Sequence, residues 1–349
     1  MNIIFILFLV VLLTPILCWG FTHLPQENRQ ILAALPGQKK KDEAWHGTTL
    51  TYYGLIVAAS YTFAVMIFIL LAASVGISLM AMTVMIVLLM VVVLPSARMM
   101  AGIVEKKKNT FTVGGAAFVA IVTAPLLLMF TGYLSRQTGH PPLPMLPMLA
   151  AMAIAYGFGE GLGRLACISF GCCYGKALRD CSPRVQRIFQ HAHLRFWGKT
   201  KKIAYASNLE GVPVLPIQAI TATIYTFTSI FGVYLFLSGH FHFAYILLLT
   251  VTQGWRCLSE FFRDDFRGDL RFSAYQIMAV IGICYSLTIL LFLPEHTAAL
   301  PDLLLGLTQL WQPGVILTLE VIAFLVFGYM GRSRTTGAVM HIHVNLDAI

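Results

Sequence analysis

Charged residues are scarce in this chain. Asp, Glu, Lys and Arg make up 11% of the 349 residues, whereas hydrophobic residues make up 58%. A soluble domain of this length does not need so much apolar surface, and several apolar runs approach the roughly 20 residues that cross a bilayer core. The composition therefore excludes an ordinary soluble protein and predicts an all-α, polytopic transmembrane helical bundle.

The sequence contains no recognition motif for nucleic acid, although its net charge is +9. The basic residues lie between apolar runs, where they set topology and meet anionic lipid heads, so no nucleic-acid partner is expected. The seven cysteines are odd in number and mostly intramembrane, which argues against a disulfide framework. No C-x-x-C pair occurs, so the spacing predicts no metal site. This applies to the cysteine and histidine group of Cys167, Cys172, Cys173, Cys181, His191 and His193.

The apolar runs predict nine spans. The first run has no basic residue at its start, so we interpret it as a retained span and not as a cleaved signal. The long polar segment between the fifth and sixth spans mixes basic and aromatic residues, which suits a small interfacial cap; a solvated loop is the alternative. The expected spans are 1–20, 51–72, 74–95, 111–132, 148–170, 213–236, 242–260, 272–293 and 313–331, and the cap is 174–212.

A glycine-rich run at 157–176 carries Glu160 and Arg164 near the end of the fifth span. Charged side chains are costly there, so they are candidates for function. The glycines at 157, 159, 161 and 163 leave one side almost free of side chains, which would let a lipid head group approach. Helix packing by small residues is the alternative explanation for these glycines.

A second charged group ends the seventh span. Arg256, Glu260 and Arg263 have offsets of four and seven, which would place them on one helix face. The acid could then hold the arginines, whose planar guanidinium groups suit bidentate binding of phosphate. An interfacial salt bridge at a helix end is the alternative.

These motifs resemble the prolipoprotein diacylglyceryl transferases. The resemblance covers about residues 47–293 and rests on five motifs that occur in the order of the family. They are Tyr53-Gly54, the run from Gly163-Arg164 to Gly175, Pro216-Ile217-Gln218, the group of Arg256, Glu260 and Arg263, and Ser273 with Gln276. The family has seven spans, which correspond to 51–293 with its cap; 1–50 and 294–349 would each add one span.

The resemblance implies transfer of a diacylglyceryl group from phosphatidylglycerol, or another anionic phospholipid, to a lipobox cysteine thiol of a prolipoprotein. The setting would be the bacterial inner membrane, with prolipoprotein signal peptides as partners and no metal or soluble cofactor. By the same resemblance, the catalytic residues would be Arg164, Arg256, Glu260 and Tyr53. The head group would be bound by Arg164, Arg256, Arg263, Gly175, Gln218 and Gln276.

The sequence departs from the family at several positions. Val113 stands where the family has a histidine that is a candidate base, and Ile220 and Thr221 replace a Tyr-Glu pair. Loss of a proton-transfer group typically costs about 10²–10⁴ in rate. A lipid transferase with another acceptor is therefore an alternative. A non-catalytic lipid-binding or transport protein is a third, less favoured because the internal repeats common in transporters are missing.

Most connections with Lys or Arg fall on the side of the cap. The positive-inside rule would place that side in the cytoplasm, whereas the resemblance implies a periplasmic site. We expect the periplasmic orientation, because seven spans would otherwise have to be inverted as a unit.

Overall fold

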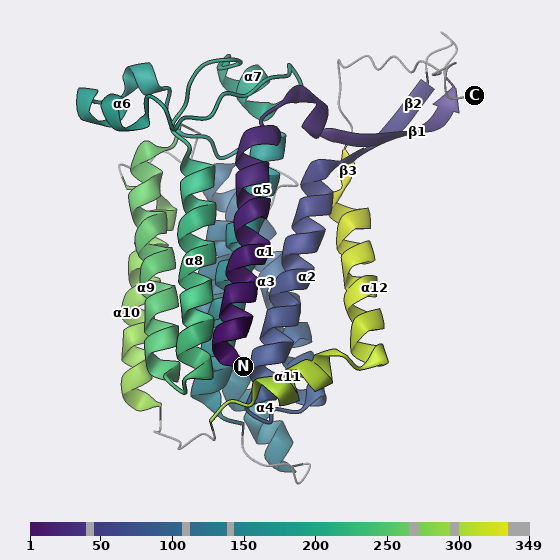
Figure 1. Ribbon diagram of the computed structural model, residues 1–349, viewed down its shortest axis with the longest axis vertical. Coiled ribbons are helices and arrows are strands. Elements are labelled where there is room, and N and C mark those ends of the chain that lie inside the picture. The colour runs from purple at the N-terminus through teal and green to yellow at the C-terminus, as the bar shows by residue number, and fades with distance from the viewer. Residues whose placement is uncertain (40–44, 107–111, 138–142, 265–271, 294–299, 334–349) are drawn as a thin grey trace.

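The structure, a computed structural model, describes residues 1–39, 45–106, 112–137, 143–264, 272–293 and 300–333. Nine helices of 18 residues or more lie in these ranges and form a bundle along one axis (Figure 1). They are α1 (Asn2–His23), α2 (Tyr52–Ser74), α3 (Leu79–Glu105), α4 (Val113–Gln137), α5 (Met145–Phe170), α8 (Ile217–Leu237), α9 (Phe241–Ser259), α10 (Ala274–Phe292) and α12 (Pro313–Met330).

Each long helix falls on a predicted span, so the all-α polytopic bundle is confirmed. Eight of those in the described ranges are long and apolar enough to cross a membrane by length and composition; α9 does not reach that hydropathy. The inner face of α9 explains the difference, because it buries Thr252, Gln253 and Arg256 along with its apolar residues. Polar residues on a buried helix face are the ones that a site inside a bundle requires.

Successive long helices alternate in direction, so every second connection, including the one that forms the cap, lies at the same end of the bundle. That end carries the strands and the cap, whereas the N-terminus and α11 (Leu303–Leu310) lie at the other (Figure 1). The cap begins after α5 and includes η2 (Leu178–Asp180), α6 (Pro183–Phe189) and α7 (Lys202–Ser207). It is folded, because backbone bridges join Val214 to both Ala177 and Leu194, and Phe196 is fully buried.

A small sheet follows α1, where only a polar connection was expected. β1 (Ile31–Lys39) pairs antiparallel with β2 (Trp45–Thr51), and β3 (Arg332–Ser333) pairs with β2. The chain before β1 includes η1 (Glu27–Arg29), and the Nε2 of Gln30 donates to the carbonyl of Thr200 at 2.9 Å. The segment after α1 is thereby fixed to the cap.

Helix α5 is the centre of the bundle and packs against α2, α8 and α9. A Cβ on Gly157 would lie 2.2 Å from Ser229 Oγ, and one on Gly161 would lie 2.9 Å from Thr226 Oγ1, so both glycines allow α8 to approach. Close packing thus accounts for these two glycines. A Cβ on Gly163 would meet nothing within 4 Å, so packing does not account for Gly163.

The helices outside 51–293 pack directly on this core. Helix α1 contacts α8 and α5, and α11 and α12 contact α2. A Cβ on Gly54 would lie 2.0 Å from Gly331 Cα, and the Thr51 N–H donates to the Gly331 carbonyl at 2.9 Å. The C-terminal helix therefore ends beside the start of α2.

Candidate functional site

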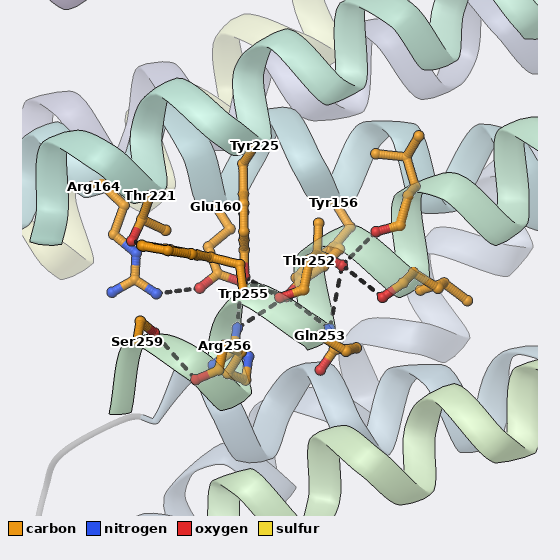
Figure 2. Close-up of polar contacts among 12 residues, drawn as sticks. Tyr156, Glu160, Arg164, Thr221, Tyr225, Thr252, Gln253, Trp255, Arg256 and Ser259 are labelled. Atoms are coloured by element: carbon orange, nitrogen blue, oxygen red, sulfur yellow. Dashed lines mark hydrogen bonds and ion pairs between the residues drawn. The ribbon is translucent and has the colours of Figure 1, made fainter. Parts of the chain in front are cut away.

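One carboxylate and two guanidinium groups form the centre of the candidate site. Glu160 lies on α5 one turn before Arg164, and its Oε1 pairs with the Nη2 of Arg164. Its Oε2 pairs with the Nη2 of Arg256, which comes from α9, at 2.5 Å (Figure 2). The side chains of Glu160, Arg164 and Arg256 are only 3%, 10% and 8% exposed. The ion pairs therefore join α5 to α9 inside the bundle.

Tyr156 completes this cluster from the preceding turn of α5. Its hydroxyl donates to Glu160 and accepts a hydrogen bond of 2.9 Å from the Nη2 of Arg256. Gln253 Nε2 also donates to this hydroxyl, at 3.3 Å. Tyr156, Glu160 and Arg164 are spaced by four residues, so a single face of α5 presents all three.

Further hydrogen bonds hold α9 against α8. The Tyr225 hydroxyl donates to the carbonyl of Thr252 at 2.5 Å, and Trp255 Nε1 donates to Thr221 Oγ1 at 2.8 Å (Figure 2). Thr252 Oγ1 in turn donates to the Leu248 carbonyl of its own helix at 2.6 Å. Because Arg256 lies one turn beyond Thr252, these contacts fix its backbone position.

The charges in this cluster do not balance. Arg164 and Arg256 share the single carboxylate of Glu160, which leaves one positive charge in excess. The Nε atoms of both arginines are buried, and neither has a hydrogen-bond partner among the described residues. Buried charges and buried donors are normally compensated. The cluster is therefore suited to binding an anion.

The second charged group, Arg256, Glu260 and Arg263, does not lie on one helix face as predicted. Helix α9 ends at Ser259 and is followed by the 3₁₀ turn η3 (Glu260–Phe262), so Arg256 and Arg263 do not share one helix face. The expected Arg256–Glu260–Arg263 face is wrong, and the acid paired with Arg256 is Glu160. Glu260 Oε1 instead lies 3.6 Å from the Nη1 of Arg263, and both side chains are 5% exposed. Burial raises the pKa of Glu260, and the charge of Arg263 counteracts this rise.

Gly175 brings three of the sequence motifs together. It forms an antiparallel bridge with Arg263, and the N–H of the next residue, Lys176, donates to the Phe262 carbonyl at 2.9 Å. A Cβ on Gly175 would lie 2.6 Å from the Leu215 carbonyl oxygen. Only glycine allows these backbones to come so close, which ties Gly175 and Arg263 to the start of α8.

The two predicted glutamines contact the protein's own backbone. Gln276 forms a capping box with Ser273 at the start of α10, and its Nε2 donates to the Cys257 carbonyl at 3.0 Å. Gln218 Nε2 donates to the Cys172 carbonyl at 3.0 Å, while its Oε1 is buried without a partner among the described residues. Gln218 therefore keeps an acceptor available for a ligand, whereas Gln276 positions α10.

Tyr53 and the start of α4 lie near the two arginines. Tyr53 packs edge-on against Phe170, with ring centroids 5.7 Å apart, and lies within electrostatic range of Arg164. A Cβ on Gly114 would lie 3.0 Å from the Nη1 of Arg256, so the start of α4 also adjoins the site. Val113, one residue earlier, is 51% exposed.

Three cysteines could hold a metal ion. The Sγ atoms of Cys167, Cys172 and Cys173 all lie within 4.8 Å of one another. Sequence spacing did not predict this group, because the turn after α5 brings the thiols together. His191 and Cys181 are not among these potential ligands.

The comparison with known families agrees with this arrangement. A model of the prolipoprotein diacylglyceryl transferase family matches residues 44–292, which is more than half of the chain. The chain belongs to this family. No curated protein compared with the chain gives a significant match. The match runs from β2 to α10, so it includes both the arginine cluster and the cap of this member of the prolipoprotein diacylglyceryl transferase family.

Family membership confirms the resemblance and implies a multi-pass membrane transferase. The sequence prediction placed Arg164 and Arg256 in the site and noted Glu160 as a charged residue at depth, but it missed Tyr156 and Gln253. The four-residue spacing of Tyr156, Glu160 and Arg164 was a usable signal for the first of these. Gln253 carried no comparable signal, because its contact depends on how α9 packs against α5.

Proposed function

We propose that this transferase moves a diacylglyceryl group from phosphatidylglycerol to the thiol of a lipobox cysteine in a prolipoprotein, in the inner membrane of bacteria. The bond between the glyceryl carbon and the phosphate oxygen breaks, and a carbon–sulfur bond forms. Glycerol phosphate leaves with the bonding electrons, and the thiol proton passes to solvent. The substrates are thus one anionic phospholipid and one membrane-anchored signal peptide.

The observation that carries this proposal is that Arg164 and Arg256 share one carboxylate. The excess positive charge lies among side chains that are at most 10% exposed, where an unpaired cation is costly. A phosphodiester carries a single negative charge and would balance it. Guanidinium groups suit this task because they are planar and donate two parallel hydrogen bonds to phosphate.

The same arginines can assist the bond cleavage. Negative charge grows on the leaving phosphate as the carbon–oxygen bond breaks, and positioned donors stabilise that charge more in the transition state than in the ground state. Glu160 and Tyr156 restrain Arg256, so little reorganisation is needed. The arginines therefore act through electrostatics, and they need not take or give a proton.

Two other groups support recognition of the head group. Arg263 pairs with Glu260 at the same end of the bundle, next to Gly175. The buried Oε1 of Gln218 lacks a partner among the described residues and can accept a hydrogen bond from a glycerol hydroxyl. Phosphatidylglycerol offers such hydroxyls, whereas phosphatidylcholine does not.

The test uses the purified full chain in lipid vesicles with a lipobox peptide and phosphatidylglycerol. Mass spectrometry should detect a diacylglyceryl thioether on the peptide cysteine and released glycerol phosphate. Vesicles of phosphatidylcholine alone, or a peptide with serine in place of the cysteine, should give no product. Arg164→Ala should abolish turnover, and the matched control Arg179→Ala, whose side chain is 71% exposed, should retain it.

Two outcomes would contradict the proposal. Consumption of phosphatidylglycerol without a modified peptide would show that the acceptor is another molecule. Absence of any turnover in a folded, lipid-embedded protein would show that this scaffold does not catalyse the transfer.

A further inference from the structure

The turn after α5 brings three thiols together. Gly171 ends α5 in the left-handed region (φ 70°), and the N–H of Cys172 donates to the Cys167 carbonyl at 3.0 Å. This pattern is a Schellman end, which folds the chain back onto its last helical turn. Cys173 also has positive φ, at 58°. As a result, all three Sγ atoms of Cys167, Cys172 and Cys173 lie within 4.8 Å of one another, and no disulfide joins them.

This geometry is close to that of a thiolate metal site. Three sulfur ligands at about 2.3 Å from a tetrahedral Zn²⁺ lie about 3.8 Å apart. Small side-chain rotations would therefore bring the thiols to coordinating distance. We propose that Cys167, Cys172 and Cys173 bind one thiophilic metal ion of the Zn²⁺ type through three thiolates.

The surroundings suit the charge of such a site. Three thiolates and a divalent cation carry a net charge of −1, and the positive charges of Arg263 and Arg164 act on Cys173. The three cysteines are half-buried, so an ion can enter from solvent while the site is largely shielded. The Cys172 carbonyl also accepts the hydrogen bond from Gln218, which fixes the turn against α8.

A three-ligand site leaves one position of a tetrahedral ion open. The identity of the fourth ligand, which would bind at this open position, rests on the proposed function. A lipobox thiol that binds there forms a sulfur–metal bond and releases its proton to solvent, because a coordinated thiol is deprotonated. The metal thereby supplies the activated nucleophile in a chain that has Val113 where the family has a histidine.

The metal site is tested without any lipid substrate. The full chain, reduced and stripped of metal with a chelator, is titrated with Co²⁺ and monitored by thiolate-to-Co²⁺ charge-transfer absorption. We expect one equivalent per chain and displacement of Co²⁺ by Zn²⁺. Cys172→Ser should weaken binding at least tenfold, whereas the matched control Cys181→Ser should bind as the unmodified chain does. A variant that keeps only the cysteine trio (Cys167, Cys172 and Cys173), with Cys18, Cys181, Cys257 and Cys284 replaced by Ser, should also keep the full absorption signal.

Equal absorption in Cys172→Ser and the unmodified chain would overturn the site. So would a lack of absorption in the trio-only chain while its helical circular dichroism is unchanged. A disulfide within the trio in protein isolated without reductant, with no Co²⁺ binding after reduction, would overturn it in favour of a redox pair.

The open position is tested by adding a lipobox peptide to the Co²⁺-loaded protein. The cysteine peptide should shift the Co²⁺ spectrum, and the peptide with serine should not. Thioether formation without any spectral shift would show that the peptide thiol does not bind the metal, and would overturn this part of the proposal. A shift without transfer from phosphatidylglycerol would support the metal–thiol contact and count against the proposed donor, so the two failures are distinguishable.

Discussion

Glu160 on α5 and Arg256 on α9 are in direct contact, with 2.5 Å between Oε2 and Nη2. The two residues are 96 positions apart in sequence, and both side chains are buried. Because Glu160 also pairs with Arg164, a single carboxylate sets the positions of two guanidinium groups. The spacing between the arginines in this transferase therefore depends on one acid.

Replacing Glu160 by Gln should destabilise the fold. The neutral amide leaves two buried guanidinium groups without a counter-charge, and breaking a buried ion pair from one side costs about 3–5 kcal/mol. Thermal unfolding in detergent should show a clearly lower melting temperature. Asp180→Asn is the matched control, because its pair with Arg179 spans 3.9 Å and is exposed. A melting temperature unchanged by Glu160→Gln would show that the ion pairs contribute nothing to stability.

Arg164→Lys and Arg256→Lys should each lower transfer by about 10²-fold, the typical effect of losing one positioned donor. Lysine keeps the charge but loses the planar fork that binds two phosphate oxygens. The rate of thioether formation from phosphatidylglycerol measures this loss, and Arg179→Lys is the control. Near-normal rates in both variants would remove the phosphate-binding role from the two arginines.

Gly114→Ala should reduce activity through Arg256. The added Cβ would lie 2.7 Å from Tyr275 Cδ1, so the tyrosine ring has to shift, and 3.0 Å from Arg256 Nη1, so the guanidinium group has to give way by a few tenths of an ångström. Gly132→Ala is the matched control on the same helix, because a Cβ there meets nothing within 4 Å. The turnover of both variants is compared at equal folded protein. Equal turnover would show that the position of Arg256 tolerates the shift.

The spans could be predicted from the sequence because the bilayer demands long apolar runs, and all nine runs became helices. The end of α3 was less accurate, since its apolar pattern continues weakly to Glu105. The strands were missed because β1 and β2 have no clear alternating pattern, and β3 pairs with β2 from the far end of the chain.

The charged residues of the candidate site could be predicted because charge is costly inside a membrane, whereas most of the contacts between them depend on how the helices pack. Arg164 was identified from its cost at bilayer depth, and Glu160 is four residues before it. The partner of Arg256 was misassigned to Glu260 because the offset of four assumed that α9 continues beyond Ser259. The thiol cluster was missed because positive φ angles at Gly171 and Cys173 cannot be read from ligand spacing.

Lys201 should make the stability of the protein depend on pH. Its Nζ is buried in the cap and donates to the carbonyls of Ser169 at 2.7 Å and Leu24 at 3.1 Å. Burial lowers the pKa of Lys201 from 10.5 to about 8. Between these values the unfolded chain binds more protons than the folded one, so the free energy of unfolding should rise with pH.

The expected gain is up to about 3 kcal/mol between pH 8 and pH 10.5, because one pKa unit corresponds to about 1.4 kcal/mol. Melting temperatures across this range should rise in the unmodified chain and lose that rise in Lys201→Met. Lys199→Met, at an exposed position, should keep the slope. The same slope in Lys201→Met would show that another group titrates.

The position of the C-terminal helix allows the orientation of the protein in the membrane to be tested. Helix α12 ends beside the start of α2, at the end of the bundle that carries the cap (Figure 1). The family resemblance predicts that this end is periplasmic, so an alkaline phosphatase fused after Ile349 should be active and a green fluorescent protein there should be dark. The N-terminus lies at the opposite end, so N-terminal fusions should behave in the reverse way. A fluorescent C-terminal fusion would instead place the basic connections in the cytoplasm, as the positive-inside rule has it, and the arginine site would then draw phospholipid from the inner leaflet.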